Sequence, residues 1–522
     1  QLLARIDDIV AHSGQHHALS ERLASHGVLP MFGFPTRTRF LYHKRPLRWP
    51  PQYGIIDREL DIAISQFAPG AQSIKDDKLH TAVGVVEFVP EAGNAVEGPN
   101  PLGESETVGV CRRCQALVPQ PMPMGTCPFC SAAQGSDGYR LAELTEPPGF
   151  STWWWISDRA EFRGGFEFTP RALRARMGAG LNNYRPHGNF SIDAGSARIY
   201  RINDNDGNDF EFRKLDHRHF WMVEEAFDSA LRDLPAAEQR RIQRPSFDSA
   251  TPPVRRALAA ISNTDVMAAG INVVPVGLCL NPSKPEAKAA WYSFGFLVRR
   301  AAAVSLDVNE SELDLGIQPI PDFSTPFAPP TARIFISDSL ENGAGYSTFL
   351  GDPDRFEELL RFVLGQARPS WTRSTSPDSF HSPLVTPPHS HDCVSSCHRC
   401  LREFGNMAYH PILDWRLGLD MARLALDPGA RIDLTESYWF DLVARIAPPY
   451  FGGLSLQART FDTLSGGVDA FNNEAFILIH PLWDTDAANF RPEVAAAVAD
   501  AQGQGFRVTL RSVFHAVRFP YE

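Results

Sequence analysis

The chain has no long apolar run and lacks the motifs of several enzyme classes. No stretch of its 522 residues approaches the roughly 20 consecutive apolar residues that span a bilayer, so we expect no membrane partner. It contains no GxxxxGK(S/T) phosphate-binding loop, no DExH-like acidic box and, in its C-terminal half, no arginine-rich helicase motif. HxK pairs of the phospholipase-D class and the GxSxG motif are also absent. We therefore expect that the chain by itself neither binds ATP productively nor hydrolyses it.

Positive charge is in deficit, with 50 basic against 61 acidic residues and a net charge of −11. This balance argues against a free-standing, non-specific DNA-binding protein, because such binding neutralises phosphates. One local stretch is an exception, in which basic residues alternate with Phe40, Tyr42 and Trp49 and could contact phosphates and stack on bases. Its candidate DNA-binding residues are Arg37, Arg39, Lys44 and Arg45, followed by Arg48. The alternative is a partly buried strand with a charged outer face.

Cysteine is scarce, yet seven of the eight cysteines fall into two tight clusters. The first is a CxxC pair, twelve intervening residues and a second CxxC pair, formed by Cys111, Cys114, Cys127 and Cys130. This is a zinc-ribbon spacing, in which four thiolates close the coordination sphere and leave no position for a catalytic water. We expect a structural zinc site; four buried free thiols are the alternative. Because no signal peptide opens the chain and its thiols are clustered, we expect a cytoplasmic protein with reduced, metal-bound cysteines.

The second cluster, Cys393, Cys397 and Cys400, offers only three thiolates. We take His410 as the candidate fourth ligand, with His391 and Cys279 as alternatives. A second structural zinc is the main interpretation. Three thiolates with a bound water could instead form a catalytic site, although no HxE arrangement stands beside them, and absence of a metal is the third possibility.

The remaining pattern predicts a mixed α/β, multidomain fold, with a zinc ribbon inserted near a β-rich region and followed by an α/β zinc-binding domain. Helices are expected within residues 1–30, a strand at 38–42, a β-hairpin formed by 198–202 and 209–213, and alternating strands and helices from 252 onward. Residues 368–392 are expected to be a loop, and the C-terminal tail a βαβ unit. The proposed domains are 1–105, 106–140 (ribbon), 141–250 (β-rich), 251–430 (zinc-binding α/β) and 431–522.

A glycine-containing segment, Ser337–Tyr346, follows an expected buried strand and precedes a helix. Exposed amides at a helix start suit a phosphate, but the segment lacks the spacing of known phosphate-binding loops. A tight structural turn is the alternative.

Several ordered motifs resemble the MrfA-like zinc-binding domain family. They are Ala289–Leu297, Leu306–Leu313, Ser337–Tyr346, Cys393 to Asn406 and His410–Arg416. This domain occurs at the C-terminus of superfamily 2 DEAD/DEAH-box DNA helicases and in the DrmB component of DISARM antiphage systems. The flanking segments Val28–Arg37 and Asp61–Gly70 look like the region just after such a motor core. The chain departs from the helicase branch, which is expected to hold zinc with four cysteines.

The resemblance implies an accessory C-terminal region of a DNA helicase, whose motor is not in this chain. Two structural zinc ions, DNA and a helicase motor in cis or as a partner subunit are the implied cofactors and partners, with ATP used only by that motor. DNA repair or antiphage defence is the implied setting. The alternatives are a metal-dependent nuclease or hydrolase that uses the second site, and a protein-binding scaffold of a defence complex.

Overall fold

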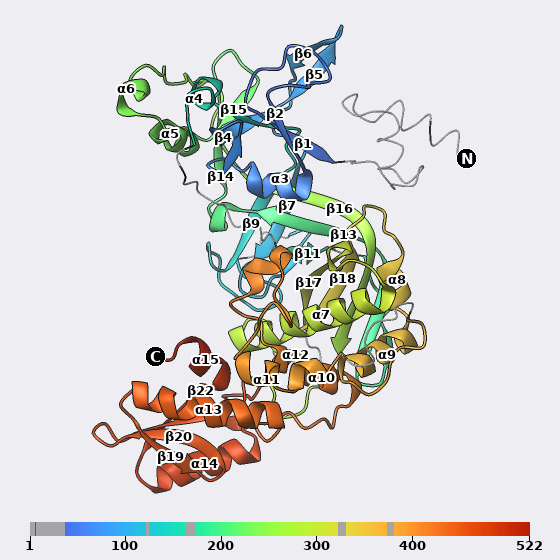
Figure 1. The fold of residues 1–522 in the computed structure, drawn as a ribbon, viewed down its shortest axis with the longest axis vertical. Coiled ribbons are helices and arrows are strands. Elements are labelled where there is room, and N and C mark those ends of the chain that lie inside the picture. The colour runs from blue at the N-terminus through green and yellow to red at the C-terminus, as the bar shows by residue number, and fades with distance from the viewer. Residues whose placement is uncertain are drawn as a thin grey trace.

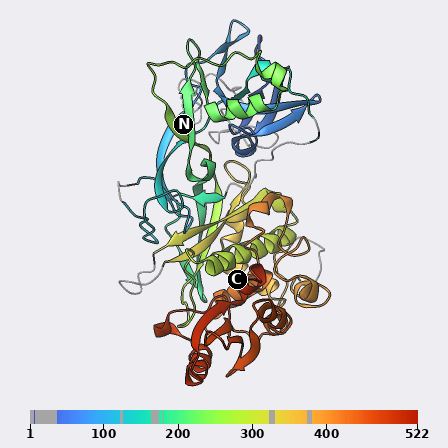
Figure 2. The same ribbon diagram turned by 90° about the vertical axis from the view of Figure 1, so that its left-hand side faces the viewer.

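The computed structural model describes residue 6 and residues 37–121, 125–162, 164, 174–178, 180–321, 330–372 and 380–521. The helices expected within residues 1–30 lie outside the described residues. Figure 1 shows an elongated molecule with an N-terminal unit at one end, a central sheet covered by helices, and a C-terminal α/β unit at the other end. Figure 2 shows the same three parts following one another along the long axis. The expected mixed α/β, multidomain class is confirmed.

The N-terminal unit is built on short, mostly antiparallel strands. They are β1 (Thr38–Tyr42), β2 (Ile55–Glu59), β3 (Gln72–Lys75), β4 (Lys78–Val86), β10 (Phe150–Thr152) and β15 (Phe220–Met222), with the separate hairpin β5 (Phe88–Glu91) and β6 (Asn94–Glu97). The helices are α3 (Leu60–Gln66), α4 (Trp154–Ser157), α5 (Glu224–Arg232) and α6 (Ala236–Gln239). The strand expected at 38–42 is confirmed.

The cysteine ribbon is inserted into this unit, between β6 and β10 along the chain. Strand β7 (Ser105–Cys111) pairs with β8 (Leu117–Val118) and with β9 (Tyr139–Thr145). A small core surrounds the cysteines, in which Ala116, Ala132 and Tyr139 are the buried non-cysteine members. So few apolar residues cannot stabilise a fold of this size alone, which is the usual reason for a metal in such modules.

Five strands of the central region pair in a closed ring. Strand β13 (Phe190–Asn203) pairs with β11 (Ala175–Met177) and β16 (Val254–Ile271), and β17 (Leu313–Ile320) and β18 (Thr331–Asp338) complete the circuit from β11 to β16. Met177, Ile199, Val266 and Phe335 share one buried cluster in this ring. The sheet is thus continuous across residue 250, because β13 pairs with β16 from Phe190–Ile271 to Asn203–Leu258.

The hairpin expected from 198–202 and 209–213 is not formed. Strand β14 (Phe210–Lys214) pairs with β15 and with β16, and β13 also pairs with β16. Residues 204–209, which contain the 3-10 turn η1 (Asn205–Gly207), are therefore an excursion between two strands that run in the same direction. The 18-residue strand β16 is long enough to pair with both, a long-range effect that the local turn signal does not contain.

Helices α7 (Pro285–Leu306), α9 (Pro353–Val363) and α12 (Trp415–Leu426) cover the central strands (Figure 1). Helix α7 is buried on nearly all sides and ends at Asp307, whose φ of 60° is left-handed. It lies close to α12, because a Cβ atom on Gly418 would stand 2.8 Å from the carbonyl oxygen of Ser293. Glycine at 418 thus permits the contact that holds the two helices together.

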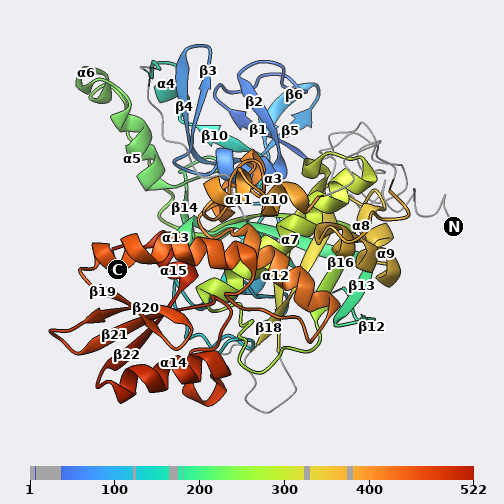
Figure 3. The same cartoon turned by 60° about the horizontal axis from the view of Figure 1, so that its bottom comes forward.

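The C-terminal unit contains the expected βαβ arrangement. Strands β21 (Glu474–Ile479) and β22 (Arg507–Ser512) are parallel and joined through α14 (Pro492–Gly503), while β19 (Gln457–Phe461) and β20 (Leu464–Asp469) add antiparallel strands. Figure 3 shows this sheet between α13 (Ser437–Gly453) and α14, with α15 (Val513–Arg518) nearby. One buried apolar core runs from the central helices into this unit. Among the described helices, none combines the length and apolar character needed to cross a membrane.

Candidate metal centres

The four ribbon cysteines converge on one point. Their sulfur atoms all lie within 4.8 Å of one another, and the Cys111–Cys130 and Cys114–Cys127 sulfur pairs are each 3.7 Å apart. A tetrahedral zinc ion with bonds of about 2.3 Å to sulfur requires sulfur–sulfur edges of about 3.8 Å. A disulfide would bring two sulfurs to about 2.05 Å, so these are free thiols arranged for a metal.

Each CxxC pair is followed by a residue in the left-handed region, Gln115 with φ 68° and Ser131 with φ 56°. The backbone turns sharply there: the amide of Cys111 donates to the carbonyl of Ala116 at 3.0 Å, and that of Ser131 donates to Cys127 at 2.9 Å. These two turns present the four sulfurs from opposite sides of one point.

The pKa shifts of the ribbon thiols indicate that the four sulfurs share protons at close range. Hydrogen bonds from Cys114 and Cys127 lower the pKa of Cys111 to about 7, and hydrogen bonds lower the pKa of Cys130 as well. The pKa values of Cys114 and Cys127 are raised, chiefly because their thiols donate to Cys111. Four thiolates cannot share this space unless a cation replaces the shared protons, so the donor set fits zinc.

The second cluster is completed by His389. One ligand atom from each of His389, Cys393, Cys397 and Cys400 lies within 4.8 Å of the others. The Cys400 sulfur is 3.8 Å from the sulfurs of both Cys393 and Cys397. These separations match the tetrahedral edge derived above, so a set of three cysteines and His389 replaces the expected set that contained His410.

The imidazole of His389 has the environment of a metal ligand. Its Nδ1 lies 2.8 Å from the carbonyl oxygen of Leu384, so Nδ1 carries the proton and donates it. Its Nε2 is buried and has no hydrogen-bond partner of good geometry among the described residues. A backbone carbonyl that fixes the tautomer and leaves the other nitrogen bare is the usual support of a zinc-bound histidine.

The ligand groups of the second cluster also share protons, as the ribbon thiols do. A hydrogen bond from Cys393, and then the proximity of His389, lower the pKa of Cys400 to about 4. The same contact with Cys400 raises the pKa of His389. A zinc ion would displace the shared protons and leave His389 neutral.

The three residues considered earlier for the fourth position lie elsewhere. The Nε2 of His410 faces the Glu403 carbonyl at 3.0 Å and the Asn406 side-chain oxygen at 2.8 Å. The His391 side chain is 73% exposed and contacts Asp392, and Cys279 belongs to neither cysteine group. His389 was missed because residues 368–392 were expected to be a loop. The signal that could have found it is the H-x3-C spacing to Cys393, since the short helix α11 (His389–Asp392) places the two residues one turn apart.

Arg416 holds the cysteine loop on helix α12. Its side chain is 0% exposed, and its guanidinium donates to the carbonyls of Val394 at 2.8 Å, Tyr438 at 3.0 Å and Cys393 at 3.3 Å. The Trp415 indole also donates to the Cys393 carbonyl, at 3.4 Å. The Asp-Trp-Arg end of the His410–Arg416 motif therefore supports the loop that carries the ligands.

Helix α7, which carries segment 289–297, contacts segments 393–406 and 410–416 at the same place. Ser293 of α7 accepts from the amide of Asp414 at 2.8 Å, and the Tyr292 and Tyr409 rings lie 4.7 Å apart. Arg300 of α7 donates to the carbonyl of Cys400. Segments 289–297, 393–406 and 410–416, which are separated in sequence, thus form one packed unit around the second metal site.

The Ser337–Tyr346 segment is a tight turn whose amides are already occupied. The carboxylate of Asp338 accepts from the amides of Ala344 at 2.7 Å, Tyr346 at 3.1 Å and Ser347 at 2.9 Å. Asp265 accepts from Gly345 at 3.1 Å. A phosphate would have to displace two carboxylates, so the structure favours the turn interpretation.

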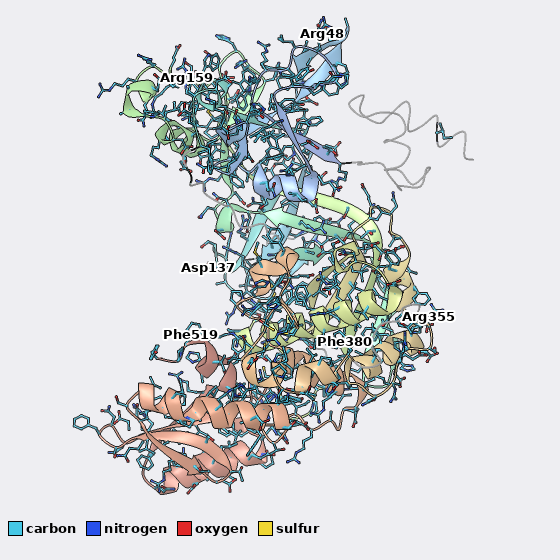
Figure 4. The ribbon with its side chains drawn as sticks, in the orientation of Figure 1. Arg48, Asp137, Arg159, Arg355, Phe380 and Phe519 are labelled. Carbon is cyan, nitrogen blue, oxygen red and sulfur yellow. The ribbon has the colours of Figure 1, made fainter. Side chains whose placement is uncertain are left out.

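The basic stretch near the start divides into an internal and an exposed part. Arg37 forms an ion pair with Glu146 at 2.6 Å, and Arg39, which is 9% exposed, donates to the carbonyl of Pro147 at 2.8 Å. Lys44, Arg45 and Arg48 are exposed. They belong to the loop between β1 and β2, and Figure 4 shows Arg48 at the outer end of the N-terminal unit.

Exposed apolar side chains accompany these cations. Leu47 is 76% exposed and Tyr53 is 85% exposed. The loop 43–54, defined here as the basic loop, therefore combines three exposed cations with one exposed aromatic ring. Arg37 and Arg39 do not contribute to this surface, because their guanidinium groups bind acceptors within the protein.

Comparison with protein-family models finds no match, and comparison with curated proteins finds no significant match. Among solved structures, the chain is similar to the crystal structure of the DUF1998 helicase MrfA bound to DNA, with 8% sequence identity and a TM-score of 0.26. The alignment covers 70% of this chain and 40% of that protein, so the chain spans less than half of the helicase's length. A likeness of this degree establishes neither a shared fold nor a shared activity.

Proposed function

We propose that this chain is an accessory region of a DNA helicase, in which two structural zinc sites shape a DNA-binding scaffold and a separate motor hydrolyses ATP. The observation that carries the proposal is the convergence around the second metal site. Three of the segments that resemble the MrfA-like zinc-binding domain, 289–297, 393–406 and 410–416, pack against one another there, with Arg416 and Arg300 bound to the ligand loop.

The metal chemistry supports a structural role over a hydrolytic one. Each candidate centre gathers four protein ligands, and four ligands fill a tetrahedral zinc ion. A zinc ion that activates water needs an open position. The nuclease or hydrolase alternative would therefore require one of these ligands to leave.

The DNA-binding part of the proposal rests on the basic loop. Its exposed cations can neutralise phosphates, and Tyr53 offers a ring face on which a base can stack. Two cations of the loop form only long ion pairs. The Lys44 ammonium nitrogen is 3.9 Å from a carboxylate oxygen of Asp158, and a guanidinium nitrogen of Arg45 is 4.0 Å from a carboxylate oxygen of Glu97. The side chains of Lys44 and Arg45 are 62% and 54% exposed, and ion pairs this long contribute little energy and are readily exchanged for phosphates.

The setting of this activity is part of the same proposal. Reduced, metal-bound thiols fit a cytoplasmic protein, and the motor would act in cis or as a partner subunit. DNA repair and antiphage defence both fit such an accessory region.

The test is salt-dependent DNA binding by the purified chain. We expect the logarithm of the affinity for a labelled oligonucleotide to fall linearly with the logarithm of salt concentration. Replacing Lys44, Arg45 and Arg48 together by alanine should weaken binding by about 100-fold and flatten the slope. The matched control replaces three other exposed arginines, Arg240, Arg241 and Arg244, and should bind nearly as the wild type does.

Two results would contradict the proposal. If the wild type shows no salt-dependent affinity for DNA, the protein-binding scaffold becomes the better account. If both triple variants lose affinity equally, the effect reflects net charge and not the basic loop.

A further inference from the structure

A cavity of about 530 Å³ lies where the ribbon, the N-terminal unit and the second zinc module meet. The ribbon contributes Val110, Arg112 and Gln115, and the 3-10 helix after Cys400 contributes Ala408. Residues 68–71 of the N-terminal unit and residues 202–206, at the end of β13 and in the turn after it, form further parts of the wall. Both metal-bound modules therefore supply walls to one space.

The carboxylates that line the cavity already have cationic partners. Asp204 binds Arg140 at 3.0 Å, and Asp206 binds Arg112 at 3.1 Å. Arg140 also binds Asp209 at 2.8 Å. The acidic groups of this wall are thus neutralised by residues of the protein.

Two further arginines of the wall have no carboxylate partner among the described residues. They are Arg174 and Arg176, which flank Ala175 at the start of β11 and therefore project from the same face of the strand. The guanidinium of Arg174 lies over the rings of Tyr409 at 5.7 Å and Tyr292 at 6.0 Å. These ring faces hold its charge in place without neutralising it.

Arg176 is buried, with 9% of its surface exposed, and is fixed by the ribbon backbone. One of its terminal nitrogens donates to the carbonyls of Ala116 at 2.9 Å and Cys111 at 3.1 Å. A guanidinium has five donor hydrogens, so others remain for a ligand.

Gln115 is a further polar residue of the cavity wall. The side chain is 4% exposed and lines the cavity, and its Nε2 donates to the carbonyl of Arg112 at 2.6 Å. Its Oε1 has no donor among the described residues. A buried amide oxygen without a partner is costly, so the hydrogen bond of its Nε2 is what fixes this side chain in the wall.

We propose that this cavity binds a backbone phosphate of a single DNA strand through Arg174 and Arg176. The inference rests on the proposed function and gives it a specific site. It also assigns a role to the pair of zinc sites, which hold the two walls at a fixed separation.

A competing explanation is that the cations balance the ribbon itself. Four thiolates and one Zn²⁺ carry a net charge of −2, and nearby cations would offset it. Lys288 of α7 is close enough to respond to both groups. Burial and the charge of Arg174 lower its pKa to about 8, whereas the thiols of Cys114 and Cys111 act to raise it. The zinc content of an Arg174 variant separates this explanation from DNA binding.

The experiment compares Arg174→Ala with Arg113→Ala on the full chain. Arg113 is exposed on the ribbon and does not line the cavity, so both variants lose one positive charge from neighbouring surfaces. Affinity for a labelled single-stranded oligonucleotide is measured across a salt series, together with zinc content. We expect Arg174→Ala to weaken binding about tenfold and to reduce the salt slope by about 0.7, with two zinc ions retained. Arg113→Ala should change little.

Other outcomes identify which part of the account fails. Equal affinities of the two variants, with wild-type DNA binding intact, would overturn the cavity assignment alone, and zinc loss from Arg174→Ala would assign the cation to the ribbon. Inorganic pyrophosphate tests the source of the phosphate: binding that depends on Arg174 without any effect of Arg174 on DNA affinity would overturn the DNA assignment. If the wild type binds no DNA, the proposed function fails at the first step.

Discussion

His389 shows how much a single residue decides at the second metal site. Its Nδ1 donates to Leu384, and its bare Nε2 stands among three sulfurs. Without it the centre has three ligands and an open position, which is the arrangement of a catalytic zinc. With it the centre is closed, and the structural interpretation follows.

His389→Ala should therefore remove the second zinc ion. We expect the metal content to fall from about two zinc ions per chain to about one, because three thiolates hold zinc less tightly than a closed set. Release of zinc to a chromogenic chelator measures this. His391→Ala and His410→Ala are the matched controls and should retain both ions; loss of zinc from His410→Ala with retention in His389→Ala would refute the ligand assignment.

A buried histidine pair in the N-terminal unit gives the protein a specific acid sensitivity. The rings of His43 and His80 lie 4.3 Å apart. Burial first, then the neighbouring His80, Lys75 and Lys44, lower the pKa of His43 to about 4, although Asp76 acts in the opposite direction. Burial also lowers the pKa of His80.

The unfolded chain binds protons at these histidines more readily than the folded chain does. Their contribution to stability is therefore complete above about pH 6.5, the unfolded pKa, and is lost as the pH falls from there toward 4. His43→Gln should reduce the drop in the urea midpoint between pH 7.5 and pH 5. An identical drop in the variant and the wild type would show that the histidine pair does not control the acid sensitivity of the urea midpoint. Release of zinc by acid affects both proteins alike, so it does not alter the comparison.

At the scale of elements, a buried polar network attaches the C-terminal unit to helix α12. The carboxylate of Asp420 is 0% exposed and accepts from the Tyr438 hydroxyl at 2.7 Å, the Trp439 indole at 2.7 Å and His480 Nε2 at 3.0 Å. His480 accepts in turn from the amide of Leu482 at 3.1 Å. Each donor comes from an element beyond α12, so one carboxylate joins three parts of the chain.

Asp420→Ala should destabilise this junction strongly. The substitution leaves three buried donors without an acceptor, which costs about 3 kcal/mol or more. We expect a clearly lower urea midpoint for the unfolding transition that includes the C-terminal unit. Tryptophan fluorescence during urea unfolding measures this midpoint. Asp441→Ala removes an exposed carboxylate from neighbouring α13 and should change the midpoint little; equal effects of the two would show that the network contributes no net stability.

The sequence predicts those elements whose signal is local. Cysteine spacing is sufficient for the ribbon, because two CxxC turns can meet at one ion whatever surrounds them. The βαβ tail follows from apolar runs separated by a helical pattern. The hairpin prediction failed because β13 and β14 both pair with β16, a strand about 50 residues away in sequence.

Features that depend on distant segments could not be read from the chain. The role of His389 requires the fold of residues 381–393, and the burial of Arg416 requires the carbonyls of a loop about 22 residues earlier. The cavity between the zinc modules joins residues 68–71 to Ala408. The same limit applies to the basic stretch, where only the structure separates the internal Arg37 and Arg39 from the exposed Lys44, Arg45 and Arg48.

At the scale of the whole molecule, the two candidate metal centres lie where larger units meet. Arg176 joins the ribbon to the central ring of strands, and the second centre connects α7 to α12. A DNA strand that contacted both the basic loop and the cavity would run along the N-terminal unit from its outer end toward the ribbon. In the proposed function, zinc acts on DNA binding indirectly, by fixing the relative positions of the surfaces that would bind.

The metal content of the purified chain, measured by elemental mass spectrometry on the wild type, Cys127→Ser and Cys400→Ser, tests this account most directly. We predict about two zinc ions in the wild type and about one in each variant, because each substitution opens one closed centre and leaves the other intact. A wild type with one zinc ion that Cys400→Ser retains would leave only the ribbon, and would contradict both the second centre and the proposal built on it.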